Sequence, residues 1–260
     1  MSDAVRSSSD EQVVSGCHVH VGVPDPETAI QVVNRVRLDV PILLALSANS
    51  PFWEGSDTGY ASYRTELFHR WPTTGLPELF SSRAEYDALV ATMTRVEAID
   101  APARLYWDLR PSARYPTLEL RVADVLPTVE EAVVLAGLFR ALVAEAIGDI
   151  AAGGVVPDPR PELLRAAVWR AARFGLDERL LDLREIALVD AHEAVDRLVD
   201  RLDPHLDATG DRERIVAGVR SLHAHGTGAT RQRAAHDRRG DLLDVCRDLI
   251  STGPRRPDPR

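Results

Sequence analysis

The order of strand-like and helical segments is the feature that most constrains how this chain can fold. Residues 13–23 are rich in valine and bounded by glycines, which predicts a strand. Residues 104–112 and 116–125 predict two more strands, and the short turn between them favours an antiparallel hairpin. Helical patterns dominate from residue 128 onward. Strands early and helices late predict an α+β fold with a helical C-terminal half rather than alternating βαβ units.

Capping residues and helix breakers indicate where helices begin and end. Asp25 is placed to cap a helix that begins at Pro26, and Pro41 is expected to break or kink that helix. Thr128 followed by Glu131 forms a capping-box pattern. We expect one domain over 13–250, with a flexible arm at 1–12 and a flexible tail at 251–260. Helices are further expected over residues 83–97, 128–150, 161–175, 187–206, 211–226 and 241–251.

Composition and charge exclude several classes of protein. The 260-residue chain has a formal net charge of −9, which disfavours nucleic acid as a partner. No apolar run is long enough to span a membrane, and two cysteines are too few for a disulfide scaffold, so we expect a cytoplasmic location. All 31 basic residues are arginine. A chain without lysine cannot be a lysine-bound pyridoxal enzyme, a Walker-type phosphate binder or a protein kinase.

Two histidines lie at alternate positions of the first expected strand. Side chains alternate across a strand, so His18 and His20 share one face, whereas Cys17, Val19 and Val21 share the other. Imidazole is a common metal ligand and can also donate a hydrogen bond to phosphate. Two histidines on the solvated face of an edge strand would give the same pattern, so the spacing alone leaves both interpretations open.

The expected hairpin carries charged pairs with the same alternation. Glu119 and Arg121 share one face of its second strand, and Asp108 and Arg110 share one face of its first. Cross-strand salt bridges would explain both pairs. The alternative is a face that sets metal-binding carboxylates beside phosphate-binding arginines, because Mg²⁺ takes one or two carboxylates and keeps the phosphates of its substrate.

The segment at residues 54–80 is loop-like but dense in aromatic and charged groups. It contains Tyr60, Arg64 and His69. Long loops of this kind are functional or disordered, and the aromatic content argues against disorder. An arginine here could clamp a substrate carboxylate, or the loop could simply dock on the core through its aromatic rings.

A glycine-rich motif at residues 225–233 precedes Arg231 and Arg233. Exposed backbone amides followed by arginines suit an anionic ligand. The same glycines could instead mark the end of one helix, with the next beginning at Thr227 or Thr230. The motif is not a Walker loop, because its lysine is missing.

These motifs occur in one order along the chain and together resemble a known family. The chain is similar to the carboxylate-amine ligase branch of the bacterial glutamate–cysteine ligase type 2 family over about residues 13–241. The resemblance implies a fold like the glutamine synthetase catalytic domain, with a curved antiparallel sheet, helices on one side, and Mg²⁺ and ATP on the concave face. The matching segments are GCHVHVGVPD, LLALSANSPFWEGSDTGYASYRTELFHRWPTTG, WDLRPS, TLELRVADV, WRAARFGL and GTGATRQRA.

The resemblance also implies a reaction and its substrates. Family members form amide bonds with ATP: the glutamate γ-carboxylate becomes an acyl phosphate, and cysteine or another amine displaces phosphate. The branch is associated with weak glutamate–cysteine ligation. We therefore expect small-molecule substrates and no membrane partner, with the amine acceptor and a homo-oligomeric state left open.

The resemblance assigns roles to residues at matching positions. It implies that His18, His20 and Glu119 lie at the metal. Arg121 would contact nucleotide phosphates, and Arg121 and Arg64 are the expected catalytic residues. The residues expected to bind substrate or ATP are Tyr60, Arg64, Arg110, Arg121, Arg231 and Arg233.

One part of the family pattern has no counterpart in residues 1–12. Family members usually begin with a strand that bears a cluster of metal-binding glutamates. We expect a domain without this segment: the coding sequence begins further upstream, the segment is a separate polypeptide, or the chain is a non-catalytic homologue that binds a nucleotide or a partner. A sheet short of a strand has unpaired backbone groups and favours association. A zinc hydrolase built on His18, His20 and a carboxylate is a weaker alternative.

Overall fold

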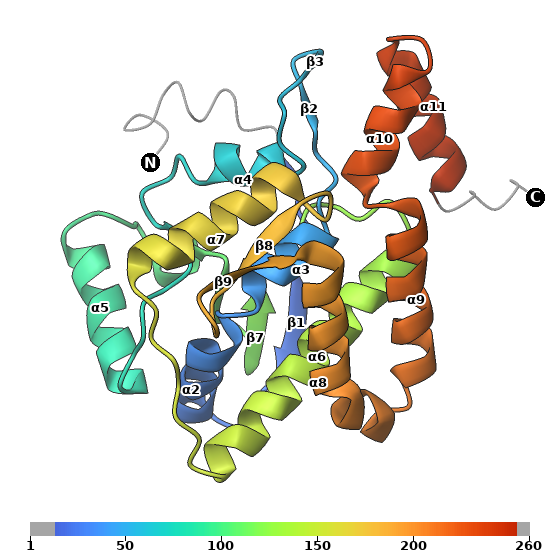
Figure 1. The fold of residues 1–260 in the computed structure, drawn as a ribbon. Helices are drawn as coiled ribbons and strands as arrows, with labels where there is room; N and C mark the ends of the chain where they lie inside the picture. The colour runs from blue at the N-terminus through green and yellow to red at the C-terminus, as the bar shows by residue number, and fades with distance from the viewer. Residues whose placement is uncertain (1–13, 254–260) are drawn as a thin grey trace, which may run out of the picture.

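The computed structural model describes residues 14–253, which form an α+β fold with helices packed around a small sheet (Figure 1). The sheet has the strand order β1-β7-β6. Its strands are β1 (Val19–Gly22), β7 (Thr117–Leu120) and β6 (Leu109–Pro111). β6 and β7 pair antiparallel, which confirms the expected hairpin, and β1 pairs antiparallel with the other edge of β7. The α+β class is confirmed, and the curvature of the sheet stays a prediction.

Helices α2 (Pro26–Val36) and α6 (Val129–Ala151) pack against the sheet and enclose the main core. Leu109, Leu118 and Leu120 are fully buried on this side. Because neighbouring residues of a strand point to opposite faces, the residues between these leucines face away from the two helices. The sequence therefore dictates a sheet with one apolar face and one polar face.

Both expected helix starts are confirmed by their caps. The Asp25 carboxylate accepts hydrogen bonds from the backbone N–H groups of Glu27 and Thr28. The Thr128 hydroxyl accepts one from the N–H of Glu131, as in a capping box, and donates to the Glu131 carboxylate. These bonds satisfy N–H groups that have no partner within the helix.

Pro41 does not interrupt α2, because α2 ends before it. Pro41 lies in the first turn of the next helix, where its missing N–H is not needed.

The remaining elements of the first half are short and lead the chain around the sheet. These elements are α3 (Val40–Leu46), β2 (Phe52–Trp53), β3 (Ser56–Asp57), α4 (Tyr63–Phe68), β4 (Thr74–Gly75), α5 (Arg83–Arg95), the 3-10 helix η2 (Pro102–Arg104) and β5 (Tyr106–Trp107).

The second half is mostly helical, with one correction. Residues 187–190 were expected to begin a helix, but they form a strand that pairs with residues 179–182. The helix begins only at Ala191, because Asp190 caps it by accepting from two backbone N–H groups. The elements are α7 (Pro161–Phe174), β8 (Arg179–Asp182), β9 (Ala187–Asp190), α8 (Ala191–Ala208), α9 (Arg212–His225), α10 (Gly228–Asp237) and α11 (Leu242–Thr252).

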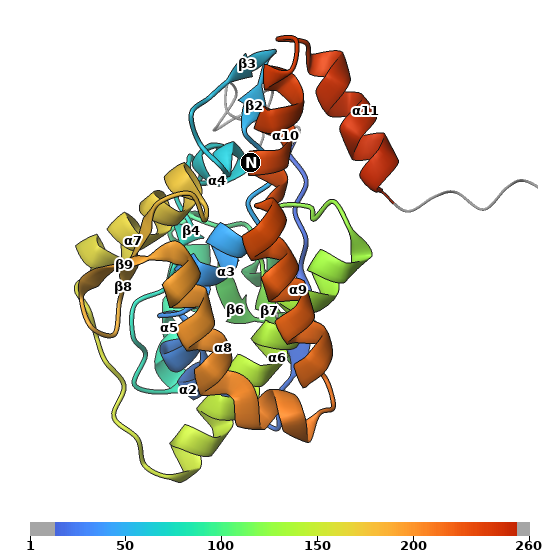
Figure 2. The same ribbon diagram turned by 45° about the vertical axis from the view of Figure 1, so that its right-hand side comes forward.

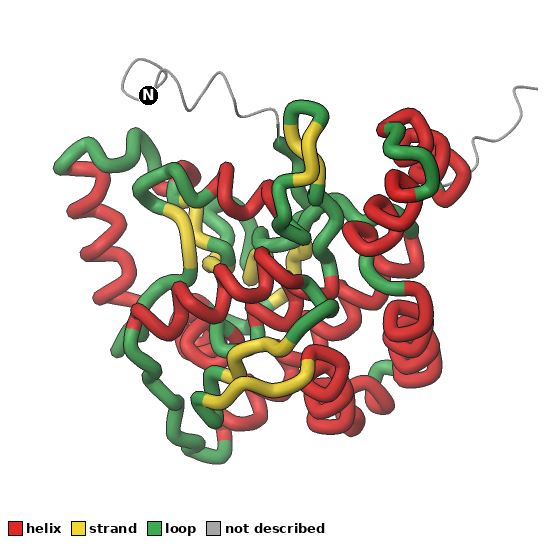
Figure 3. The backbone as a smooth tube through the Cα atoms, turned by 45° about the horizontal axis from the view of Figure 1, so that its top comes forward, coloured by secondary structure: helices red, strands yellow, loops and turns green. Residues whose placement is uncertain are grey.

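Helices α10 and α11 form a hairpin that stands beside the β2–β3 hairpin at one end of the molecule (Figures 2 and 3). The rings of Phe52 and His236 lie 5.1 Å apart across this contact. Helix α11 runs to Thr252 and so includes the first residues of the expected tail. The expected arm and the remainder of the tail lie outside the described residues. No helix within residues 14–253 is long and apolar enough to cross a membrane.

Candidate phosphate-binding site

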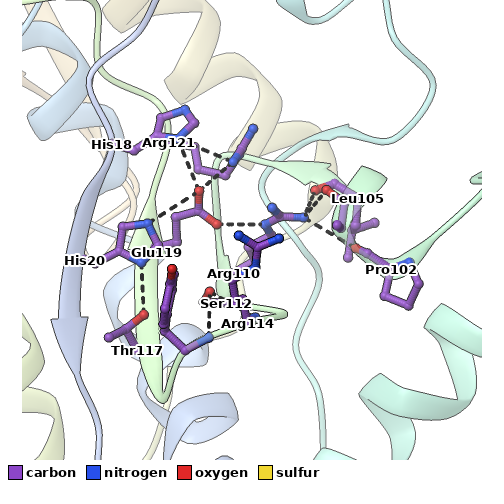
Figure 4. Close-up of polar contacts among 12 residues, drawn as sticks. His18, His20, Pro102, Leu105, Arg110, Ser112, Arg114, Thr117, Glu119 and Arg121 are labelled. Carbon is purple, nitrogen blue, oxygen red and sulfur yellow. Dashed lines mark hydrogen bonds and ion pairs between the residues drawn. The ribbon is translucent and has the colours of Figure 1, made fainter.

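The polar face of the sheet brings the predicted residues of three strands together. In the strand register, Glu119 of β7 stands between His20 of β1 and Arg110 of β6. One step along, the backbone N–H of Arg121 donates to the carbonyl of Asp108, so these two residues also stand side by side. His18, His20, Arg110, Glu119 and Arg121 therefore converge from separate parts of the sequence, as Figure 4 shows.

Glu119 is the centre of this cluster. Its Oε1 atom accepts from Arg121 Nη1 at 2.6 Å, and its Oε2 atom accepts from Arg110 Nε at 3.1 Å. His18 Nδ1 lies 3.1 Å from Oε1, and His20 Nε2 lies 3.7 Å from the same atom. Both carboxylate oxygens are thus engaged by guanidinium groups.

Charge and burial fix the ionisation of Glu119. Its side chain is only 7% exposed, and burial alone would raise the pKa of its carboxyl. The hydrogen bond from His18 and the charges of Arg121 and Arg110 act in the opposite direction, and together they hold the pKa of Glu119 well below its usual range. Burial lowers the pKa of Arg121, and Glu119 opposes that shift. The carboxylate is charged at neutral pH.

Arg110 is fixed in place, whereas Arg121 keeps donor capacity. Arg110 Nη1 also donates to the backbone carbonyls of Ala103 and Leu105. Arg121 commits Nη1 to Glu119, its Nε is buried without a hydrogen-bond partner, and Nη2 has no partner among the described residues. A guanidinium held by one edge can offer the other to a phosphate oxygen. Arg121 is therefore the side chain of the cluster best prepared to meet an anion.

His18 and His20 form the exposed rim of the cluster. Each side chain is 36% exposed, compared with 7% for Glu119. His20 Nδ1 is held by the hydroxyl of Thr117 at 2.9 Å, and its ring meets the edge of Tyr115. The alternation expected for the first strand is present, with both imidazoles on the polar face.

The described residues do not form a Mg²⁺ site by themselves. Mg²⁺ prefers oxygen ligands, and the cluster around Glu119 offers one carboxylate, already bound to two guanidinium groups, beside two imidazoles. Within residues 14–253, no group of three or more His, Cys, Asp or Glu side chains is arranged to hold a metal ion. The assignment of His18, His20 and Glu119 as metal ligands stays a prediction.

Arg64 is buried against the backbone that carries Arg121. Its side chain is 7% exposed, and Nη1 and Nη2 donate to the backbone carbonyls of Val122 and Arg121 at 3.0 and 3.1 Å. A Cβ on Gly16 would lie 2.3 Å from Arg64 Nη2, so only glycine leaves room for the guanidinium. Arg64 supports the backbone from which Arg121 projects, so it acts here through position, and its predicted catalytic contact stays untested.

The other predicted arginines belong to separate clusters. Arg233 makes two 2.8 Å bonds to the carboxylate of Asp57 and also donates to the backbone carbonyl of Tyr60. The Tyr60 hydroxyl accepts from the indole of Trp169 at 3.2 Å. These contacts tie α10 to β3, and both α10 and α7 to the loop that follows β3. The predicted substrate contacts of Tyr60 and Arg233 stay untested.

Arg231 pairs with the capping box of α6. Its Nη2 donates to Glu131 Oε1 at 2.7 Å, and its Nη1 donates to the carbonyl of Gly226. Gly226 ends α9 and Thr227 caps α10, which agrees with one of the two interpretations of the glycine-rich motif. The predicted contact of Arg231 with substrate stays untested.

A second titratable pair was not predicted from the sequence. His69, the C-cap of α4, places Nε2 at 3.2 Å from a carboxylate oxygen of Asp108, which is 1% exposed. In the sequence, His69 belongs to the aromatic-rich segment at residues 54–80, and Asp108 belongs to the first strand of the expected hairpin. They are 39 positions apart, and nothing local in the sequence indicates that they meet.

Comparison with known proteins supports the family resemblance that the sequence motifs indicate. Curated relatives carry the name "Putative glutamate–cysteine ligase 2", some with a numeral after it. One from Frankia alni is 52% identical over 92% of this chain and 62% of its own length. Another, from Rhodopirellula baltica, is 42% identical over 96% of this chain and 66% of its own length. The chain thus spans just under two thirds of the length of each of these relatives.

A solved structure shares the fold at low sequence identity. The crystal structure of a glutamate–cysteine ligase from Francisella tularensis in complex with AMP matches 95% of this chain and 60% of its own, with a TM-score of 0.57 and 12% identity. A sequence model of glutamate–cysteine ligase family 2 matches residues 3–248. That match covers nearly the whole chain, and the chain belongs to the glutamate–cysteine ligase family 2.

Proposed function

We propose that this chain carries the phosphate-binding face of an ATP-dependent carboxylate–amine ligase that joins glutamate to cysteine or another amine. The observation that carries the proposal is the cluster of Arg110, Glu119 and Arg121 on the polar face of the sheet, with the half-exposed His18 and His20 at its rim. Family membership supports it, and so does the fold shared with a ligase whose crystal structure contains AMP.

The arrangement suits the transfer of a phosphoryl group. In the proposed first step, a γ-carboxylate oxygen of glutamate attacks the terminal phosphorus of ATP, and ADP leaves. Negative charge then spreads over the phosphoryl oxygens, and a guanidinium held in place stabilises that charge. Arg121 supplies this contact through Nη2, and Glu119 fixes its orientation from the opposite side. In the second step an amine attacks the acyl carbon and phosphate leaves.

The test uses the 260-residue chain with ATP, Mg²⁺, glutamate and a panel of amines. Glutamate-dependent release of phosphate and formation of the amide product are measured together. Removal of one stabilising donor at developing charge costs on the order of 100- to 1,000-fold in kcat, so we expect that loss for Arg121→Met. Arg197→Met is the matched control, because that arginine forms exposed ion pairs on α8. Wild-type protein without glutamate-dependent phosphate release contradicts the proposal.

A nucleotide-binding homologue without turnover is the second candidate. It is favoured by the absence of a complete metal-ligand set within residues 14–253. Calorimetric titration separates the two. ATP binding that Arg121→Met weakens, together with no amide product from any amine, would support the second candidate over the first.

A further inference from the structure

The pair formed by His69 and Asp108 stands at the edge of the phosphate-binding face and has no part in the cluster around Glu119. Asp108 is the cross-strand neighbour of Arg121, because the N–H of Arg121 donates to the carbonyl of Asp108 at 2.8 Å. Asp108 directly precedes β6 and Arg121 directly follows β7, so this hydrogen bond places the His69–Asp108 pair at the end of the sheet where Arg121 lies.

The contact leaves one ring nitrogen of His69 available. Nε2 lies 3.2 and 3.4 Å from the two carboxylate oxygens of Asp108. A buried carboxylate beside Nε2 favours the tautomer with its proton there, so the lone pair of the neutral ring is on Nδ1. In the part of the chain that the structure describes, the hydrogen bonds of the His69 ring are made by Nε2 and none by Nδ1. The side chain as a whole is 25% exposed.

On the basis of the function proposed above, we propose that His69 accepts the proton of the attacking amine, with Asp108 as the positioning residue that fixes its ring. An amine substrate arrives as an ammonium ion, which has no lone pair for attack. An acyl phosphate made at Arg121 needs a nearby base to release that lone pair. Two imidazoles near Arg121 contact a buried carboxylate: His18 meets Glu119 within the phosphate-binding cluster, and His69 meets Asp108 outside it, so His69 is the one with no part in that cluster.

The proposed step balances in atoms and charge. The ammonium group gives one proton to Nδ1 of His69, and the nitrogen lone pair forms the C–N bond with the acyl carbon. The C–O bond to phosphate then breaks, and the second N–H proton leaves with the departing phosphate. The imidazolium returns its proton to solvent. The products are the amide, hydrogen phosphate and one proton.

The charges around His69 favour a proton acceptor that works near neutral pH. Burial lowers the pKa of His69, but the adjacent carboxylates of Asp108 and Glu66 outweigh it, against a smaller opposing effect of Arg64, and the pKa is raised from its ordinary value of 6.5. A general base is most effective when its pKa lies close to the working pH. The balance of these groups therefore suits the proposed role.

The experiment compares two nucleophiles that differ in their need for a base. Hydroxylamine is unprotonated at neutral pH and attacks acyl phosphates without help, whereas cysteine is largely protonated on its amine. General base catalysis contributes typically about 100- to 10,000-fold, so His69→Gln should lose at least about 100-fold in kcat with cysteine. Hydroxamate formation from glutamate, ATP and hydroxylamine should stay within a few-fold of wild type. His223→Gln, which removes an imidazole 3.7 Å from Asp196 on the helical side, is the matched control.

Two further readouts distinguish a base from a residue that only supports the structure. With cysteine, the kcat of His69→Gln should recover as pH rises and free amine accumulates, while KM for ATP stays unchanged. Asp108→Asn should move the acidic limb of the wild-type pH profile toward lower pH, because it removes the charge that raises the pKa of His69. The second readout does not require the His69 variant to fold, because it is measured on Asp108→Asn and wild type.

The outcomes separate this inference from the function on which it rests. Equal losses with cysteine and hydroxylamine in a folded His69→Gln protein overturn the role of His69 alone. An unchanged acidic limb in Asp108→Asn does the same for the positioning role. Wild-type protein that makes neither amide nor hydroxamate overturns the proposed ligase function, and this inference with it.

Discussion

Replacing Glu119 by glutamine tests whether this carboxylate holds the cluster together. The change keeps the shape of the side chain but removes the charge that two guanidinium groups share. Arg110 and Arg121 are 7% and 11% exposed, so neither can recover full hydration. Glu119→Gln therefore leaves two nearly buried cations facing each other across a neutral amide.

The expected loss follows from the burial of the group. Removing one partner of a buried ion pair costs about 3–5 kcal/mol, and the glutamine oxygen still accepts one hydrogen bond, which places the expected cost near the lower limit of about 3 kcal/mol. For a domain of this size, 1 kcal/mol shifts Tm by about 2–4 °C, so we expect Tm to fall by roughly 6–12 °C.

Thermal and urea unfolding followed by circular dichroism at neutral pH measure this loss. The matched control is Glu185→Gln, which neutralises a carboxylate that is 63% exposed and pairs with one exposed arginine, and which should unfold like wild type. A Glu119→Gln protein as stable as wild type would refute the reasoning. It would mean that Arg110 and Arg121 do not depend on Glu119, and that the carboxylate is free for another partner such as a cation.

Two further predictions concern the same face. Arg64→Met should destabilise the fold in urea by about 1–3 kcal/mol for each of the two backbone carbonyls that lose their donor, and unchanged stability would show that water replaces the guanidinium. Because the pKa of Glu119 is lower in the folded chain than its ordinary 4.5, its contribution is fully present above that pH and is lost as pH falls toward the folded-state pKa. The difference in unfolding free energy between wild type and Glu119→Gln should therefore shrink from neutral pH to about pH 3, and a constant difference would contradict this.

Local periodicity accounts for the part of the site that could be predicted. A strand alternates its side chains with a period of two, so the sequence alone places His18 with His20 and Glu119 with Arg121. The short turn at residues 112–115 makes pairing of β6 with β7 the simplest topology, and it is observed. The register that sets Arg110 opposite Glu119 is given by the structure.

Contacts between distant segments could not be predicted in the same way. Arg233 meets Asp57 across 176 positions and Arg231 meets Glu131 across 100. Such pairs depend on how helices pack, and no periodicity within either segment encodes it. Arg64 is predicted as a site residue from the family resemblance and because an arginine can clamp a carboxylate, but its burial against the backbone of residues 121 and 122 follows only from the tertiary fold.

The β8–β9 hairpin was missed for a related reason. Each strand has four residues, and leucine, alanine and arginine are also good helix formers. Cross-strand pairing of Leu180 with Val189 and of Leu181 with Leu188 decides the structure, and that pairing is a property of two segments together. Asp190 then sets the first residue of α8.

Arg110 makes a set of contacts that a lysine could not make. Its guanidinium donates through Nε to Glu119 and through Nη1 to the carbonyls of Ala103 and Leu105, so one side chain joins the sheet to the segment before β5. A lysine ammonium is a single point charge and cannot reach a carboxylate on one side and two carbonyls on the other. With Arg110 and Arg121 sharing one carboxylate, the cluster keeps a net positive charge on a chain whose formal charge is −9. Such a local excess of positive charge, already held in place before any ligand arrives, is what a triphosphate requires of its binding face.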